Sequence, residues 1–217
     1  MKKILITQAI HFDKKRNTYY DYVDIRLIKT FYRLGFKPIT ISNFFNEPEK
    51  YLKDLKVEGI ILSGGSDIGK FPLRDRNEIK LISFAIKKKI PLIGICRGMQ
   101  IVNKYFKGKL VKIDGHVKKK HLIENLVFKN KAVVNSYHNY AIDKKKLNRD
   151  LKPIFMCKKD RSIEAFIHIQ ESILGIMWHP EREKKLKNFD KQIIQQFILK
   201  TKKFRKKLFF KDKNEKI

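Results

Sequence analysis

One cysteine stands between two glycines in the motif GICRG, residues 94–98, a setting typical of a nucleophile. An apolar run precedes it and a helical pattern follows, so Cys96 is expected where a buried strand turns into a helix. The flanking glycines remove Cβ clashes at a sharp turn, and the free amides at the helix start favour a thiolate and a developing oxyanion. A small buried cysteine without chemistry is the simpler interpretation, and the spacing alone does not exclude it.

A thiol nucleophile needs a base, and His179 in the motif GIMWHPE is the best placed by sequence. Glu181 follows two positions later, so in an extended segment both side chains point to one side and the carboxylate can fix the imidazole tautomer. Cys96, His179 and Glu181 are therefore predicted to form a catalytic triad. A lone histidine is more often structural, and the pairing with Cys96 is what favours catalysis. His138, in a polar segment after a predicted strand, is the alternative base.

Two backbone amides are candidates for an oxyanion hole. Gly64 and Gly65 form a turn after a predicted strand, and glycine lets such a turn present its amide. We expect the Gly65 and Arg97 N–H groups to face the reacting carbonyl, although a Gly-Gly pair without the cysteine motif would be interpreted as a simple loop.

The substrate itself is expected to contact side chains near the cysteine and after a later strand. The candidates are Gln100, Ser136, Tyr137 and His138. Asp67 and Glu164 are weaker candidates for binding the cationic end of an amino acid.

The elements that must position these residues follow an α/β pattern. Short β-branched runs alternate with longer helical patterns, which predicts a parallel sheet with helices on both faces. The segment 107–131 carries no readable motif and is expected to form loops around the substrate. The expected strands are 4–7, 38–41, 57–62, 91–95, 131–135, 153–156, 163–167 and 173–177, and the expected helices are 20–31, 75–89 and 185–201.

The composition limits the class of protein. Lysine and arginine number 51 against 22 acidic residues, a formal charge of +29, yet 42% of residues are hydrophobic, which excludes a disordered polycation. Lysines are spread through nearly every segment, so nucleic acid is an unlikely partner. No apolar stretch reaches the roughly 20 residues of a membrane span, and no signal peptide is recognised, so we expect a cytoplasmic protein without membrane contact. Residues 1–201 are expected to form one catalytic domain and 202–217 a frayed basic tail.

A metal or cofactor is not expected. The two cysteines, Cys96 and Cys157, show no CxxC spacing, and His116 and His121 flank a lysine run without a third ligand at metal spacing. The predicted chemistry therefore rests on side chains alone.

The motifs GICRGMQ, GGSD and WHPE, at these intervals, resemble the class I glutamine amidotransferase family over roughly residues 3–200. The resemblance implies a three-layer, flavodoxin-like fold with a mainly parallel central sheet. It also implies that Cys96 attacks a γ-glutamyl carbonyl while His179 carries the proton to the leaving nitrogen, with Glu181 orienting the histidine. A glutamyl thioester forms, and water activated by His179 releases glutamate.

Other segments resemble the stand-alone γ-glutamyl hydrolases of that family. The stretch 74–78 and the motif VNSYH are similar to γ-glutamyl-γ-aminobutyrate hydrolases, although Asn139 replaces the second histidine of that branch. VNSYHNYAI, GHVKKKH, SIEAFIH and IMWHPERE are more similar to γ-glutamyl-CDP-amidate hydrolases. The latter resemblance implies cleavage of a cytidylyl-phosphoglutamine to glutamate and cytidine diphosphoramidate, a donor for the modification of surface glycans.

Two other functions compete with a stand-alone hydrolase that acts on a small, nucleotide-linked γ-glutamyl substrate. The chain is alternatively a glutaminase subunit that passes ammonia to a synthase partner, because both classes use the same triad. A basic nucleic-acid-binding module with a vestigial triad is the third hypothesis, and it predicts salt-dependent retention on DNA with an unreactive Cys96.

Overall fold

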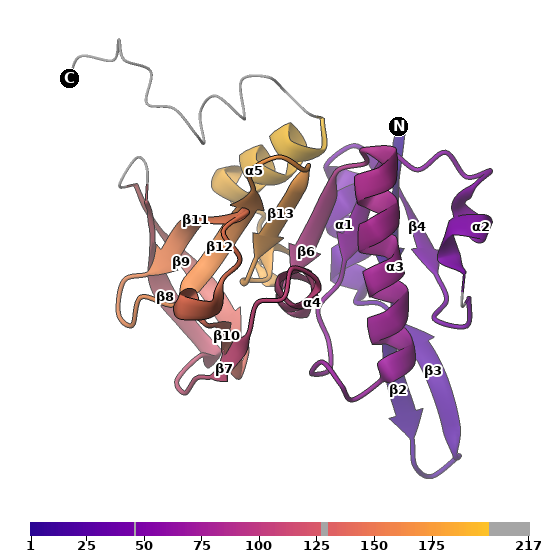
Figure 1. Ribbon diagram of the computed structural model, residues 1–217, viewed down its shortest axis with the longest axis horizontal. Helices are drawn as coiled ribbons and strands as arrows, with labels where there is room; N and C mark the ends of the chain where they lie inside the picture. The colour runs from indigo at the N-terminus through magenta and orange to yellow at the C-terminus, as the bar shows by residue number, and fades with distance from the viewer. Residues whose placement is uncertain (46, 127–129, 200–217) are drawn as a thin grey trace.

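The computed structural model describes residues 1–45, 47–126 and 130–199. Its centre is a nine-stranded sheet in the order β4-β1-β5-β6-β13-β12-β11-β8-β9 (Figure 1). The strands are β1 (Lys2–Thr7), β4 (Phe36–Ile41), β5 (Gly59–Leu62), β6 (Leu92–Ile95), β8 (Val117–Asn125), β9 (Lys131–Tyr137), β11 (Leu151–Cys157), β12 (Ile163–His168) and β13 (Ile173–Ile176).

The sheet has a parallel half and an antiparallel half that meet at β13. The strands β4, β1, β5, β6 and β13 run parallel, whereas β12, β11, β8 and β9 continue the sheet with antiparallel pairings. Every residue of β5 and β6 is buried, as expected of central parallel strands covered on both faces. The predicted α/β class with parallel central strands is confirmed.

Helices cover both faces of the sheet, and each face has its own apolar core. On one face pack α1 (Ile25–Arg33) and α5 (Asn188–Ile198), which contribute Phe31 and Ile194. On the other pack α2 (Pro48–Leu52), α3 (Pro72–Lys88) and α4 (Arg97–Tyr105), of which α3 crosses in front of the sheet in Figure 1. Helix α4 follows β6 directly, so the residue between them is fixed from both sides.

The segment 18–22, expected to start a helix, forms a strand instead. A hairpin of β2 (Ala9–Asp13) and β3 (Thr18–Tyr22) precedes α1, whose N-cap Asp24 accepts a hydrogen bond from the Arg26 amide at 2.9 Å. Tyr20 fits the helical spacing of the later apolar residues, but the local run of threonine and tyrosine favours a strand.

The segment 107–131 was expected to form loops, and this was wrong for much of it. It contains β7 (Leu110–Lys112), which pairs with β10 (Tyr140–Ile142), and the nine-residue β8. The lysine run of β8 lies at its exposed end, where it hides the alternation that identifies a strand from sequence. The strand instead becomes regular through its pairing with β9 and β11.

The end of the chain lies outside the described residues. Helix α5 ends at Ile198, whereas the sequence predicted a helix to residue 201, and the predicted basic tail 202–217 is not described. Within the described ranges, none of the helices combines the length and apolar character required to cross a membrane.

Candidate active site

Three neighbouring parallel strands deliver the predicted reacting groups to one edge of the sheet. Strand β5 leads into the Gly64–Gly65 turn, β6 into Cys96, and β13 towards His179 (Figure 1). Ile95 pairs with Ile176, and the Cys96 amide donates to the Ile176 carbonyl at 2.8 Å. The sheet register therefore brings together residues that are far apart in the sequence. Ligand sites of open parallel sheets lie at this carboxyl edge.

Cys96 has a left-handed backbone conformation, with φ 52° and ψ −105°, at the N-cap of α4. A non-glycine residue in such a sparsely populated region costs about 1–3 kcal/mol and is maintained only by its surroundings. A Cβ on Gly94 would overlap the Gly98 carbonyl, and a Cβ on Gly98 would overlap the Leu62 carbonyl. The two flanking glycines thus permit the close approach of strand and helix, and the strain falls on the cysteine itself.

His179 is held between Cys96 and Glu181. Its Nδ1 donates to Glu181 Oε1 at 2.6 Å, which leaves Nε2 for the side-chain hydrogen bond with Cys96. Burial lowers the pKa of His179, but the negative charge of Cys96 and the hydrogen bonds with Cys96 and Glu181 outweigh it and raise the pKa to about 9. The arrangement favours an imidazolium beside a thiolate.

The backbone of His179 is fixed by the neighbouring strand β9. Asn135 accepts from the His179 amide at 2.9 Å and donates to the His179 carbonyl at 2.8 Å. Pro180 and Glu181 then form a short 3-10 turn, η2 (Pro180–Arg182). Asn135 was not recognised from the sequence, because an asparagine within a strand pattern carries no signal of a partner so far along the chain.

The Gly64–Gly65 turn packs directly against the imidazole. A Cβ on Gly64 would lie 2.7 Å from His179 Cε1, so no larger residue fits there. Gly65 has φ 138°, a conformation that favours glycine, and it remains solvent-exposed. The predicted oxyanion amide of Gly65 therefore belongs to a turn that touches the predicted base.

A buried ionic network supports this turn from below. Arg74 donates to the Ser63 and Gly64 carbonyls, both at 2.9 Å, and pairs with Glu78 at 3.0 Å. Arg97 also pairs with Glu78 and with Asp75. Although burial opposes ionisation of Glu78, the charges of Arg74 and Arg97 keep the pKa of its carboxyl below the ordinary value. In the sequence, the 74–78 stretch was visible only as a resemblance, and its supporting role was not recognised.

The predicted substrate-binding residues of β9 and its extension point in two directions. Tyr137 lies edge-on to the His179 ring with centroids 5.8 Å apart, whereas Ser136 and His138 face His116 on the other side. This separation follows from the two-residue period of a strand. Burial lowers the pKa of His138 to about 4 despite the nearby Glu164 carboxylate, so His138 is a weak rival base. Among these three, Tyr137 alone contacts the His179 region.

Gln100 and Glu164 are also engaged within the protein. The Gln100 amide donates to the Tyr140 carbonyl at 2.9 Å. Glu164 is fully buried and lies among three histidines, so it does not match the expected role of binding a substrate amino group; Asp67 is exposed on the loop after β5.

A recess of about 110 Å³ reaches the His179 side of the site, where Gly64, Gly65 and Tyr22 form part of its wall. Cys96 retains 6% exposure and His179 2%. A larger cleft of about 640 Å³ lies farther along the β2–β3 hairpin. Its polar and aromatic lining includes Tyr19, Tyr20, Phe44, Lys70 and Phe71. The hairpin that the sequence missed therefore forms part of both cavities.

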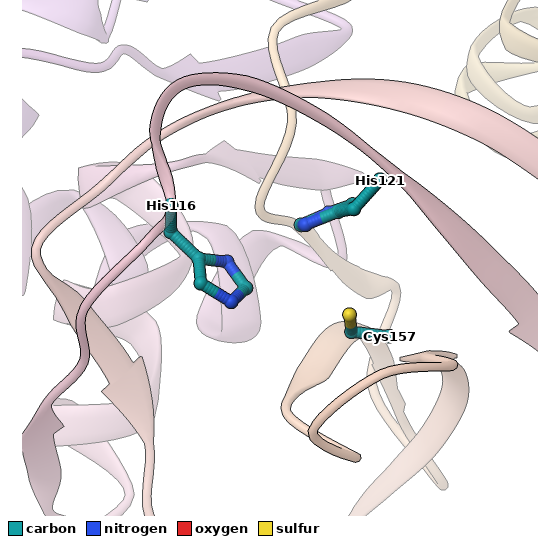
Figure 2. A group of neighbouring side chains, drawn as sticks. All are labelled: His116, His121 and Cys157. Atoms are coloured by element: carbon teal, nitrogen blue, oxygen red, sulfur yellow. The ribbon is translucent and has the colours of Figure 1, made fainter.

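A second cluster of metal-ligating side chains lies in the antiparallel half. His116, His121 and Cys157 place one donor atom each within 4.8 Å of one another, and His116, His138 and Glu164 do the same (Figure 2). Spacing along the chain indicated no third ligand for His116 and His121, because Cys157 and Glu164 arrive from the strands β11 and β12.

Comparisons with known proteins agree with this geometry. The model of the family "Glutamine amidotransferase class-I" matches residues 18–201. A γ-glutamyl-CDP-amidate hydrolase from Campylobacter jejuni is 37% identical over 170 residues, which cover 76% of this chain and 80% of the relative. The amidotransferase component of a glutamine-hydrolysing GMP synthase from Methanococcus vannielii is 32% identical over 61% of this chain and 69% of the relative. A Thermoplasma acidophilum structure assigned to a GMP synthase superposes with a TM-score of 0.72 at 20% identity, covering 95% of this chain and 96% of that one.

Proposed function

Because this chain belongs to the class I glutamine amidotransferase family, we propose that it hydrolyses a γ-glutamyl amide bond with Cys96 as the nucleophile. The observation that carries the proposal is the hydrogen-bonded series from Cys96 through His179 to Glu181 at the strained turn after β6. A buried structural cysteine needs neither the strain nor the charged neighbour.

In the acylation step, the Cys96 sulfur forms a bond to the γ-glutamyl carbonyl carbon. His179 holds the thiol proton and transfers it to the leaving nitrogen when the carbon–nitrogen bond breaks. Glu181 keeps the proton on Nδ1 of His179, so that Nε2 is the nitrogen that exchanges protons with the reacting atoms. The products of this step are a glutamyl thioester and a free amine or phosphoramidate.

The oxyanion of the tetrahedral intermediate is expected to meet the Gly65 and Arg97 amides. Arg97 begins α4, so its amide is among the unpaired donors of the helix start. Arg74 fixes the turn that carries Gly65. In the second step water adds to the thioester, His179 takes its proton, and the sulfur leaves as glutamate is released.

The nucleotide-linked version of the substrate is supported by the similarity to γ-glutamyl-CDP-amidate hydrolase and by the large cleft beside the β2–β3 hairpin. Exposed aromatic rings such as Tyr20 and Phe44 can stack on a base, and Lys70 can neutralise a phosphate. We therefore propose γ-glutamyl-CDP-amidate as the substrate and cytidine diphosphoramidate, a donor for glycan modification, as the product. A glutaminase subunit with a synthase partner is the second candidate, because a component of glutamine-hydrolysing GMP synthase is among the relatives.

The test is to incubate the purified chain with glutamine, γ-glutamyl-γ-aminobutyrate and γ-glutamyl-CDP-amidate and to quantify released glutamate. We expect efficient turnover of the nucleotide-linked compound without any partner. Phe44→Ala should raise its KM but leave slow glutamine hydrolysis unchanged. Strong glutamine hydrolysis that needs an added synthase would favour the second candidate, and no glutamate from any compound would refute both.

A further inference from the structure

The cluster around Glu164 is outside the chemistry proposed for Cys96. His116 precedes β8, His121 lies within it, His138 follows β9, and Glu164 lies in β12. Figure 2 shows His116, His121 and Cys157 directed into one space between these strands. Separate segments of the chain therefore contribute donor atoms to one buried place.

Glu164 is a buried carboxylate that requires positive charge nearby. Its side chain is 1% exposed, and its ion-pair partners are histidines: His121 at 3.2 Å, His138 at 3.7 Å and His116 at 3.9 Å. Ser162 donates one hydrogen bond to Oε1, but Glu164 Oε2 and the facing His121 Nε2 are buried without a hydrogen-bond partner. A buried charge with so few compensating contacts is costly unless a cation joins it.

The outer nitrogens of two histidines are already committed. His138 Nδ1 donates to the Tyr140 carbonyl at 3.0 Å, because a carbonyl can only accept. His116 Nε2 lies 2.6 Å from the Asp160 carboxylate, which likewise accepts. The inner nitrogens, His116 Nδ1 and His138 Nε2, then face each other at 3.2 Å. Outer bonds to a carbonyl and a carboxylate are the way in which proteins orient metal-binding histidines.

We propose that His116 Nδ1, His138 Nε2 and Glu164 Oε1 bind a divalent transition-metal ion of the zinc class. The three donor–donor distances are 3.2, 3.7 and 3.9 Å. Donors about 2.1 Å from a tetrahedral ion stand about 3.4 Å apart, so small adjustments suffice. Two nitrogens and one carboxylate oxygen suit zinc, and the fourth position is left for water or His121.

Cys157 belongs to an overlapping set that the proposal does not choose. It shares His116 and His121, but in that set Glu164 keeps a buried charge without a ligand role. The choice makes a spectroscopic prediction, since a sulfur ligand gives cobalt an intense charge-transfer absorption and a nitrogen–oxygen site does not.

The metal would fasten the β8–β9 pair to β12. Strand β9 also carries Asn135 and Tyr137, which contact His179, and the Tyr140 carbonyl that accepts from His138 also accepts from Gln100. We therefore expect the ion to stabilise the frame beside the active site rather than to touch the substrate.

The experiment removes metal from the full chain with a chelator and then titrates Zn²⁺ against a chromophoric competitor. Wild type should bind one Zn²⁺ per chain, and Co²⁺ should give a tetrahedral visible spectrum without sulfur charge transfer. Glu164→Gln should weaken Zn²⁺ binding at least about 100-fold, and Asp160→Asn, which removes only the outer hydrogen bond, about 10–100-fold. His11→Gln, at an exposed histidine, and Cys157→Ala should bind as wild type does.

Circular dichroism of each zinc-free variant checks that it is folded, and the partly exposed Asp160 gives a variant that spares the core. Absence of stoichiometric Zn²⁺ binding by wild type would overturn the proposal. So would unchanged affinity in both Glu164→Gln and Asp160→Asn, which would indicate adventitious surface binding. Loss of Zn²⁺ in Cys157→Ala, together with sulfur charge transfer in the wild type, would replace the proposed ligands with the Cys157 set.

Discussion

Two buried histidine centres lie on either side of β9, and they differ in what surrounds the imidazole. His179 has a carboxylate on one nitrogen and a strained cysteine on the other, at the carboxyl edge of the parallel strands. His116 and His138 have their outer nitrogens tied to Asp160 and the Tyr140 carbonyl, and their inner nitrogens converge on Glu164 among antiparallel strands.

The comparison shows that the neighbours of a histidine decide its use. An imidazole paired with a thiol has a proton to move, whereas imidazoles that converge with a carboxylate have lone pairs to share with a cation. The two-residue period of β9 separates the centres, because Asn135 and Tyr137 contact His179 while Ser136 and His138 face His116.

The largest expected effect distinguishes the two cysteines. Cys96→Ala should abolish turnover, because no other group can form the thioester, while unfolding remains cooperative. Cys157→Ala should keep turnover near the wild-type rate. Glutamate release under saturating substrate measures both, and an inactive Cys157→Ala beside an active Cys96→Ala would mean that the nucleophile has been misassigned.

The next effect compares the two histidine centres directly. His179→Gln should lower kcat by roughly 10³–10⁴-fold, as expected when a base that activates a nucleophile is lost. His138→Gln should lower it by less than about tenfold, through loosened packing beside Gln100. Single-turnover rates separate the chemical step from product release. A reversed order of these two variants would make His138 the base.

The pH dependence should sharpen the assignment of His179. Its pKa is raised to about 9, so the imidazolium that protonates the leaving nitrogen is present below that pH and is lost above it. The acylation rate should therefore fall above about pH 9. Glu181→Gln removes a hydrogen bond that raises this pKa, so the alkaline limb should move to lower pH. An unshifted limb in that variant would assign the limb to another group.

The same pKa shift links stability to pH. The raised pKa of folded His179 stabilises the fold fully below the unfolded value near 6.5, and this contribution disappears as the pH rises through about 9. Wild type should thus lose more of its free energy of unfolding between pH 6.5 and 9 than His179→Gln does. Denaturant unfolding of both proteins across this range measures the difference, and parallel curves would contradict the shift.

The smallest expected effect concerns the second centre. Treatment with a chelator should lower the thermal midpoint of unfolding but change turnover at 25 °C by less than about twofold, since the proposed ion does not touch the substrate. Turnover that disappears with the metal and returns with Zn²⁺ would instead join the two centres into one.

The motif around Cys96 could be interpreted from sequence because its constraints are local. Gly94 and Gly98 are required where a strand and a helix meet within a few residues, and that requirement is visible in five consecutive letters. Apolar runs such as 59–62 likewise identified the buried parallel strands. The hairpin of β2 and β3 was missed because its alternation resembles the start of a helix, and β8 was missed because lysines cover its exposed end.

By itself the sequence determined the chemistry available to this protein: a thiol at a sharp turn, an imidazole with a carboxylate two residues later, and strands that prefer burial. Tertiary structure decided which groups meet. The register of β6 against β13 joins Cys96 to the His179 segment, Arg74 reaches the Gly64 turn, and histidines from distant segments surround Glu164. Such contacts depend on strand order and on the side of each strand that a residue occupies, and neither is encoded in the spacing of a motif.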